Sequence, residues 1–150
     1  MKTWKMNLLD NRSDKKGGIN DKFNFCKEKG IVGIGWVGYE EIGLSQDDKE
    51  FKTFKSAKSK LEQFDEGDLV WVKVPKELKL WLCVVKSKMI KTDDEEYKEN
   101  DVGYYCECEY IREFSSNDLP KKLPYESLTT RSAISSAVDQ VNDATNNIYQ

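Results

Sequence analysis

A tryptophan follows three closely spaced glycines in the sequence GIVGIGW, at residues 30–36. Glycine is unfavourable inside a β-strand because it adds no packing and loses the most backbone entropy on folding. A strand that carries Gly33 and Gly35 is therefore expected to bulge, to bend or to lie against another group. Trp36 comes directly after them, as either a core residue or the aromatic wall of a binding site, and the residues leave both interpretations open.

The chain contains no histidine, which excludes the commonest catalytic arrangements. Ser-His-Asp triads, Cys-His pairs and His-based zinc hydrolases all need that side chain. Chemistry based on two carboxylates or on a lysine stays open, but the GxSxG, P-loop and HExxH motifs are missing. We therefore expect a protein that is not an enzyme and that needs no cofactor.

The cysteines also have two interpretations. Cys26 and Cys83 stand alone, while Cys106 and Cys108 form a Cys-Glu-Cys sequence. Residues i and i+2 of a strand share one face, so the last two thiols could bind a metal together. Without a Cys-x-x-Cys motif or a histidine, small buried hydrophobic residues explain them better.

The composition is that of one globular domain. A chain of 150 residues, of which 38% are hydrophobic and 34% charged, is long enough to bury a core. It has no apolar run of roughly 18 residues, the length that a membrane span needs. Its start, MKTWKMNLLDNRSDKKGG, is not typical of a signal peptide. We expect a cytoplasmic protein with no membrane partner.

A net charge of −3 conceals an uneven distribution. Residues 52–91 hold ten lysines and five acidic residues, a balance of +5, whereas residues 92–126 hold four basic and eleven acidic residues, a balance of −7. Such a chain can present one basic face to the phosphates of a nucleic acid. Two solvated surfaces explain the same counts equally well.

The hydrophobic pattern predicts a small α+β barrel. Capping residues and apolar faces indicate two helices, at 19–30, with Asn20 or Asp21 at its start, and at 45–64. Apolar runs between turn signals indicate four strands, at 31–37, 69–74, 78–88 and 102–114. The second and third of these strands form a hairpin, and residues 91–101 form a polar loop. Lack of regular strand-helix alternation argues against a doubly wound parallel sheet.

The C-terminal segment predicts a further helix. Apolar residues recur at helical spacing after Thr130, which is a suitable N-cap. We therefore predict a domain at residues 1–130 and a C-terminal helix at residues 131–150. This helix either closes the domain or begins a linker in a longer parent protein.

Several short motifs occur in an order that is similar to a known group of proteins. The chain resembles the EVE-like domains of the PUA superfamily, which are related to the EVE and YTH modified-base readers and are found beside bacterial restriction-endonuclease domains. The resemblance covers about residues 4–135 and rests on DNR, FNFC, GIVGIGW, GDLVWVK, WLCVV and the ending LPKKLP…LTTRSAI.

The resemblance implies a PUA-like pseudo-barrel of five to six strands with flanking helices. It implies a non-catalytic reader that binds a flipped, modified base, such as a modified cytosine in DNA, in an aromatic pocket. Such a reader would act as the sensor or targeting module of a restriction or defence system, with a nuclease or another effector as its protein partner. The chain departs from the group in being acidic overall and in carrying no nuclease motif.

Under this hypothesis Trp36 stacks on the base, and Trp71 or Tyr39 supplies a second aromatic face. Gly33 and Gly35 let the backbone approach the base, while Asp68 or Asn11 recognises its edge. The predicted phosphate-binding residues are the lysines on the hairpin: Lys73, Lys76, Lys86 and Lys88.

Each assignment has a structural alternative. Trp36 and Trp71 are barrel core in that case, Asp68 is a turn residue, and the lysines are solvated. At the level of function, the alternatives are an RNA-binding PUA-like protein and a protein-interaction module. The latter would use the acidic region or the C-terminal helix as its contact surface.

Overall fold

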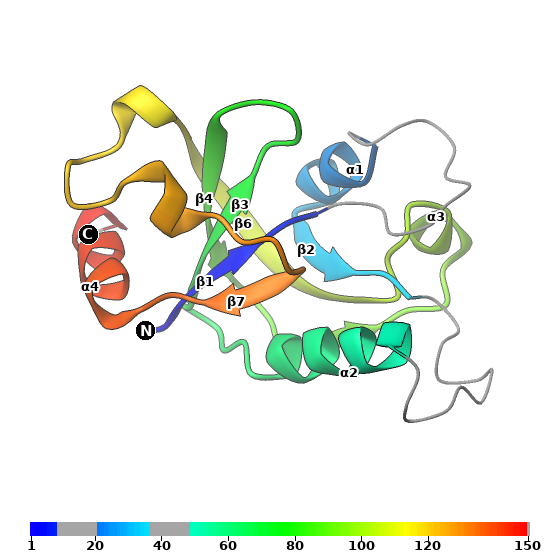
Figure 1. The fold of residues 1–150 in the computed structure, drawn as a ribbon. Coiled ribbons are helices and arrows are strands. Elements are labelled where there is room, and N and C mark those ends of the chain that lie inside the picture. The colour runs from blue at the N-terminus through cyan, green and yellow to red at the C-terminus, as the bar shows by residue number, and fades with distance from the viewer. Residues whose placement is uncertain (9–20, 37–48, 150) are drawn as a thin grey trace.

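One curled, mixed β-sheet organises the protein (Figure 1). The computed structural model describes residues 1–8, 21–36 and 49–149. Within them, seven strands follow the order β2-β6-β4-β3-β1-β7, with β5 also paired to β6. The prediction of an α+β pseudo-barrel with flanking helices is confirmed. The strands are β1 (Thr3–Met6), β2 (Ile31–Ile34), β3 (Leu69–Lys73), β4 (Lys79–Val85), β5 (Ile90–Lys91), β6 (Tyr104–Ser115) and β7 (Ile134–Ser136).

The long strand β6 joins the two ends of the sheet. Its first half pairs with β2 and β5, and its second half pairs with β4, with a register shift between Leu82 and Cys83 of β4. A bulge of this kind bends a strand and increases its twist, which helps a sheet to curl. Along β6 the side chains alternate as predicted: Cys106 and Cys108 are buried, whereas Glu107 and Glu109 are exposed.

The inner, concave face of the sheet carries the larger core. Helices α1 (Asp21–Lys29) and α2 (Lys49–Glu62) pack against it. Helix α1 ends as predicted, because Gly30 adopts a φ of +71° that favours glycine. Helix α2 contributes an apolar stripe, and β1 adds a tryptophan that stacks on Phe64. The buried side chains of this inner core include Trp4, Phe23, Ile31, Val32, Phe54, Leu61, Val70, Val72, Val85 and Cys106.

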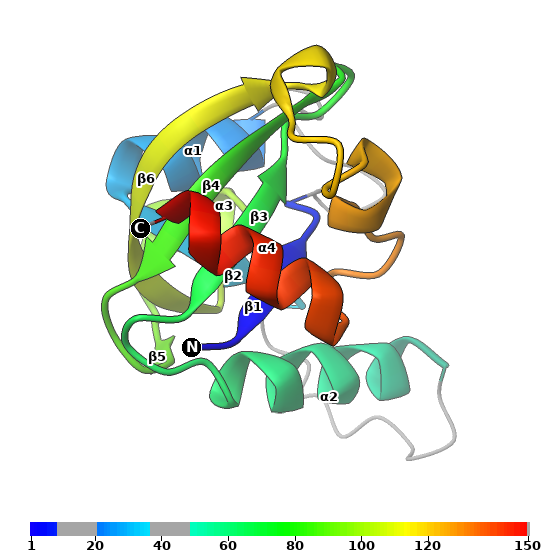
Figure 2. The ribbon, with the colours of Figure 1, turned by 90° about the vertical axis from the view of Figure 1, so that its left-hand side faces the viewer.

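The outer face carries a second, smaller core under helix α4 (Asp139–Tyr149), which crosses β3 and β4 (Figure 2). Trp71 is its largest residue and is fully buried. Its Nε1 donates to Thr145 Oγ1 at 3.0 Å, and its ring meets Phe114 edge-on with centroids 5.4 Å apart. The remaining members of this outer core are Leu69, Leu80, Leu82, Val84, Leu123, Leu128 and Val141.

The C-terminal helix begins later than predicted. It starts at Asp139 instead of following Thr130, and Ile134–Ser136 form strand β7 antiparallel to β1. The reason is tertiary: β1 pairs with β3 on one side and has an open edge on the other, and Ile134 reaches the inner core only as the strand partner of Met6. Whether residues 131–150 lead to a further domain stays a prediction.

The expected loop at 91–101 contains a short helix, α3 (Glu95–Glu99). Asp94 caps it, because its Oδ1 accepts from the backbone N–H groups of Glu96 at 2.9 Å and Tyr97 at 3.3 Å. Acidic residues in a first turn suit the helix dipole. This correction matters for function, since the turn after α3 positions Asp101 beside β2.

The four cysteines lie in the interior as free thiols, which confirms their prediction as small buried residues. Burial raises the pKa of Cys26 and of Cys106 to about 12, and it raises the pKa of Cys83 well above its usual value. The thiols of Cys26, Cys83 and Cys106 are therefore protonated at neutral pH. No helix among the described residues is both long and apolar enough to cross a membrane.

Candidate functional site

Trp36 stands where the strand β2 stops. The residue has a φ of +53°, which lies outside the range of a strand. Strand β2 therefore ends at Ile34, although the sequence predicted a strand that includes Trp36. Left-handed backbone at a non-glycine residue costs on the order of 1–3 kcal/mol and is often found at functional sites. The indole is 6% exposed, lies 6.1 Å from the Phe54 ring and donates from Nε1 to Glu50 Oε2 at 3.1 Å.

A cavity of about 130 Å³ lies beside this tryptophan. It is placed where the two edges of the curled sheet approach each other: one wall comes from the end of β2 and another from the segment that enters β7. The backbone N–H of Asn7 donates to Ala133 O at 3.0 Å and fixes that second wall to the end of β1. The lining residues are Asn7, Lys22, Gly33, Ile34, Trp36, Thr53, Arg131, Ser132 and Ala133.

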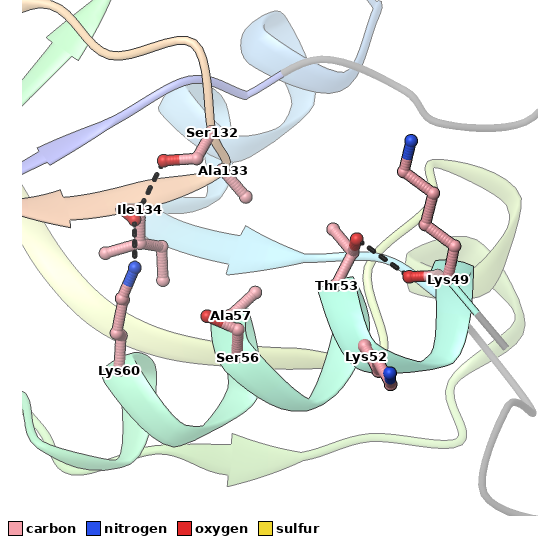
Figure 3. A pocket seen from close by; sticks show the side chains of 9 residues that line it. All are labelled: Lys49, Lys52, Thr53, Ser56, Ala57, Lys60, Ser132, Ala133 and Ile134. Atoms are coloured by element: carbon pink, nitrogen blue, oxygen red, sulfur yellow. Dashed lines mark hydrogen bonds between the residues drawn. The ribbon is translucent and has the colours of Figure 1, made fainter. Parts of the chain in front are cut away.

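A wider groove of about 290 Å³ adjoins the cavity and shares Thr53, Ser132 and Ala133 with it. Figure 3 shows that the groove runs between α2 and the segment leading into β7. Lys60 reaches across it, and its Nζ donates to Ile134 O at 3.3 Å. The other lining residues are Lys49, Lys52, Ser56 and Ala57.

The groove is positively charged. Lys49 and Lys52 extend from the first turn of α2 (Figure 3), and Arg131 stands at the mouth of the cavity. All three side chains are exposed. In residues 1–8, 21–36 and 49–149, no carboxylate lies within ion-pair distance of them. As far as the described residues go, these cations have no carboxylate partner and are available to an external anion.

A buried ion pair lies next to the cavity. Lys22, which lines the cavity, has its Nζ 3.4 Å from Asp101 Oδ2, and each side chain is only 2% exposed. Asp101 has a φ of +58°. The turn that holds it is tied to β2, because the N–H of Gly103 donates to Ile34 O at 2.9 Å.

Another group lies close to each of the two glycines, which is one of the reasons expected for glycines in this strand, and in both cases the group is part of the protein. A Cβ on Gly33 would lie 2.9 Å from Tyr104 O, and a Cβ on Gly35 would overlap the Asp101 carboxylate. Real Cβ atoms do not approach other atoms so closely. Gly33 does line the cavity, but both glycines are required chiefly by the close approach of β6 and of the buried carboxylate.

The structure does not bring Trp71 together with Trp36. Trp71 belongs to the outer core, on the opposite face of the sheet. Asp68 does not line the cavity either: it accepts from Lys2 N, from Trp4 Nε1 and from Asp65 N, each at 3.1 Å. This is the turn role that was the structural alternative for Asp68. The Asp68 carboxylate lies in the turn directly before β3, and the three donors fix its position.

The predicted hairpin lysines line neither the cavity nor the groove. Lys73 Nζ donates to Val74 O at 3.1 Å, and Lys76 occupies the turn with a φ of +65°. The ion pairs of Lys86 and Lys88 are formed with Glu109 at 3.7 Å and with Asp65 at 2.7 Å. Tyr39 and Asn11 lie outside the described residues.

Sequence reasoning missed the residues that surround the cavity. Lys22 and Arg131 carry no local motif, and they approach Trp36 only through the fold. Three lysines of α2 did leave a signal, since positions 49, 52 and 60 fall on one face of a helix. Several lysines of the basic segment 52–91 therefore belong to this helix rather than to the hairpin.

Comparison with known proteins identifies a fold. The sequence matches no protein-family profile and no curated protein. The structure is similar to the YTH domain of the Zygosaccharomyces rouxii MRB1 protein, solved in complex with N6-methyladenosine RNA. Their TM-score is 0.52 at 9% identity, over 99% of this chain and 86% of that one. A crystal structure of a protein from Agrobacterium tumefaciens aligns with a TM-score of 0.46 at 14% identity, over 98% of this chain and 92% of that one. The curled sheet thus has a YTH-like, PUA-type architecture.

Proposed function

We propose that this chain is a non-catalytic nucleic-acid reader, which holds one flipped, modified base in the cavity beside Trp36. The observation that carries the proposal is the adjacency of two features. A cavity with an aromatic wall, about 130 Å³ in volume, opens beside a lysine-lined groove of about 290 Å³. The first has the size of a single nucleobase, and the second can follow the sugar-phosphate chain on either side of it.

The size of the cavity favours one ring system. Drug-sized ligands occupy pockets of roughly 300–1,000 Å³, so a whole nucleotide needs more space than this cavity gives. Stacking on an aromatic side chain contributes about 1–3 kcal/mol per base. Extruding a nucleotide from a duplex costs a few kcal/mol. Because the two energies are similar, a modification that adds a contact or weakens pairing can decide whether the base enters.

The phosphates are proposed to lie along α2. Lys49 and Lys52 are exposed and Arg131 lines the entrance, so the three side chains can neutralise successive phosphates. This assignment replaces the hairpin lysines, whose ammonium groups lie elsewhere. It also explains how a chain with a net charge of −3 can bind a polyanion, since the local charge of the groove is positive.

The nucleic acid is proposed to be DNA that carries a modified cytosine, in keeping with the sequence resemblance to EVE-like domains. In that role the chain serves a restriction or defence system and directs a nuclease or another effector to foreign DNA. RNA is the alternative, because the YTH domain with a similar fold was solved with N6-methyladenosine RNA. We propose a cytoplasmic location for either role.

A protein-interaction module is less well supported. Val138, which directly precedes α4, is 67% exposed, and Tyr149 at the end of the helix is 39% exposed. These two residues are three turns apart, and Val141 and Thr145 between them are buried against the sheet. The exposed surface of α4 therefore has no continuous apolar stripe of the kind that partner proteins bind.

Fluorescence anisotropy at low salt tests the proposal. Matched oligonucleotides would carry cytosine, 5-methylcytosine or 5-hydroxymethylcytosine in DNA, and adenine or N6-methyladenosine in RNA. We expect selective binding of one modified strand, weakened by about tenfold or more in Trp36→Ala, because the stacking surface is lost.

The control is Trp81→Ala. Trp81 is a half-buried tryptophan on β4 that contacts Lys27 and Tyr110 and lines neither the cavity nor the groove. Thermal unfolding must show that both variants are folded. Equal losses of affinity in the two variants would show that the cavity is not the base-binding site. The absence of binding to every strand would refute the reader function.

A further inference from the structure

The buried ammonium of Lys22 is the feature of the cavity that folding alone does not explain. Lysine is almost never fully buried unless it is paired, yet this side chain is 2% exposed. It is the second residue of α1, where a positive charge opposes the helix dipole. Its neighbours on the helix, Phe23 and Cys26, are apolar core residues. Replacing a buried ion pair by apolar groups is often neutral or stabilising, so stability gives no reason to keep this one.

Among the described residues, the Lys22 ammonium has one hydrogen-bond acceptor. An ammonium has three donors, and Asp101 is its acceptor within the part of the chain that the structure describes. The Nζ–Oδ2 distance of 3.4 Å is longer than the usual 2.7–3.2 Å, so even this bond is weak. Buried donors are nearly always satisfied. The cavity beside Trp36, which Lys22 lines, can hold a further acceptor.

The surroundings hold Lys22, which lines the cavity, in place. Asp101 adopts a strained φ of +58°, and its N–H donates to Lys98 O at 3.0 Å at the end of α3. Its carboxylate fills the space that a Cβ on Gly35 would need. Placing the Asp101 carboxylate against Lys22 thus lowers stability in two ways. It requires a strained aspartate, and it requires a glycine within the sheet region.

We propose that Lys22 determines which base the cavity accepts, by donating to hydrogen-bond acceptors on the inserted edge, and that Asp101 is its positioning residue. This inference rests on the proposed reader function and adds a chemical requirement to it. Cytosine presents two adjacent acceptors, N3 and O2, on a single ring. Thymine carries an N3–H donor at the same place, which would face the Lys22 donors. A lysine donor at this wall therefore favours the N3–O2 edge of a cytosine-type ring over the N3–H edge of thymine.

The test changes one atom of the base and one residue pair of the protein. The probes are two DNA strands that carry either the cytosine form bound most tightly in the series above or its 3-deaza analogue, in which C–H replaces N3. The variants are Lys22→Met and Lys22→Met/Asp101→Asn. The double variant removes both charges, so it leaves no unpaired carboxylate in the interior and stays informative if the single variant does not fold. Lys27→Met is the control, since Lys27 is an exposed lysine of the same helix.

We expect the wild-type protein and Lys27→Met to bind the deaza strand about 10- to 100-fold more weakly, as the loss of a charge-assisted hydrogen bond predicts. The double variant should bind both strands with the same reduced affinity. A folded double variant that keeps the wild-type discrimination would overturn the inference and leave the reader function standing. Binding of N6-methyladenosine RNA without binding of any cytosine form would do the same. If no strand binds at all, the reader function itself fails.

Discussion

Two tryptophans show how differently the two faces of one sheet are used. On the outer face, Trp71 is fully buried, its Nε1 bonds to Thr145, and packed side chains surround it. On the inner face, Trp36 lies at the end of β2 with a φ of +53°, beside a cavity of about 130 Å³ and the buried ammonium of Lys22. Both indoles have a hydrogen-bond partner and both are mostly buried. Burial by itself therefore does not separate a core tryptophan from a candidate binding residue.

The two tryptophans differ in the residues that surround them. The outer core needs no strained backbone and no buried charge. The region of Trp36 has two residues with positive φ, Trp36 and Asp101, as well as a buried ion pair and unfilled space. Features that reduce stability persist where they serve another purpose. We expect mutations in the outer core to act on stability and mutations around the cavity to act on binding.

The largest expected effect is that of Trp71→Ala. Removing a fully buried tryptophan loses its transfer free energy and leaves a cavity, so the free energy of unfolding should fall by about 3–5 kcal/mol. Urea unfolding followed by circular dichroism measures it. At a temperature where the variant is folded, its affinity for the selected oligonucleotide should equal that of the wild type. If the fully folded variant lost affinity, the separation of a structural outer core from a binding site at Trp36 would be contradicted.

Thr145→Val should lower the free energy of unfolding by about 1–3 kcal/mol. The substitution keeps the shape of the side chain but removes the acceptor of Trp71 Nε1, and an unpaired buried donor carries that cost. The same urea experiment detects it, and Thr53→Val, at an exposed position of α2, is the matched control for stability. If the free energies of unfolding of the two variants differ by less than a few tenths of a kcal/mol, the outer core tolerates an indole N–H that has no acceptor.

The basic groove predicts an effect on affinity and on its salt dependence. Lys49→Gln/Lys52→Gln should weaken binding about tenfold at low salt, because two phosphate contacts are lost. The slope of log K against log salt should become shallower by about 1.4–1.8. Lys76→Gln/Lys86→Gln changes the net charge equally and removes two hairpin lysines instead. If the hairpin pair changes the slope and the α2 pair does not, the original assignment of the phosphate contacts was right.

The smallest effect is expected for an exposed ion pair that belongs neither to the cavity nor to the outer core. The hydrogen bond from Lys88 lowers the pKa of the Asp65 carboxyl below its ordinary value. A lowered folded-state pKa stabilises the protein above the unfolded-state pKa, about 3.9, and this contribution disappears as the pH falls through the folded-state value. The stability difference between the wild type and Asp65→Asn should therefore be small at pH 7 and vanish in acid. A difference that grows on acidification would contradict the assigned pair.

The sequence predicted the architecture better than the site. Periodicity found β3, β4, β6, α1 and α2, because their apolar faces repeat regularly and Gly30 marks the end of a helix. Strands β1 and β7 were missed, since each is four residues or shorter and exists only by pairing with distant segments. Tertiary pairing also converted the start of the supposed C-terminal helix into β7.

Of the predicted site residues, Trp36 and Gly33 line the candidate cavity, and their role in binding stays a prediction. Trp71 was assigned to the same pocket because the sequence cannot tell on which face of a curled sheet a residue lies when both faces are buried. Lys22, Asp101 and Arg131 come from three distant segments and meet through topology. No local sequence pattern indicates that these residues lie close together, so they could not be identified before the fold was known.

The most direct test compares the two indoles in one experiment. Each tryptophan gives one indole N–H signal in a nitrogen-15 NMR spectrum, and Trp36→Phe and Trp71→Phe assign the two of interest. During titration with the selected modified oligonucleotide, we predict that the Trp36 signal shifts strongly and saturates with the binding curve, whereas the Trp71 signal barely moves. If the oligonucleotide binds and the Trp36 signal stays unchanged, the cavity beside Trp36 is not the base pocket.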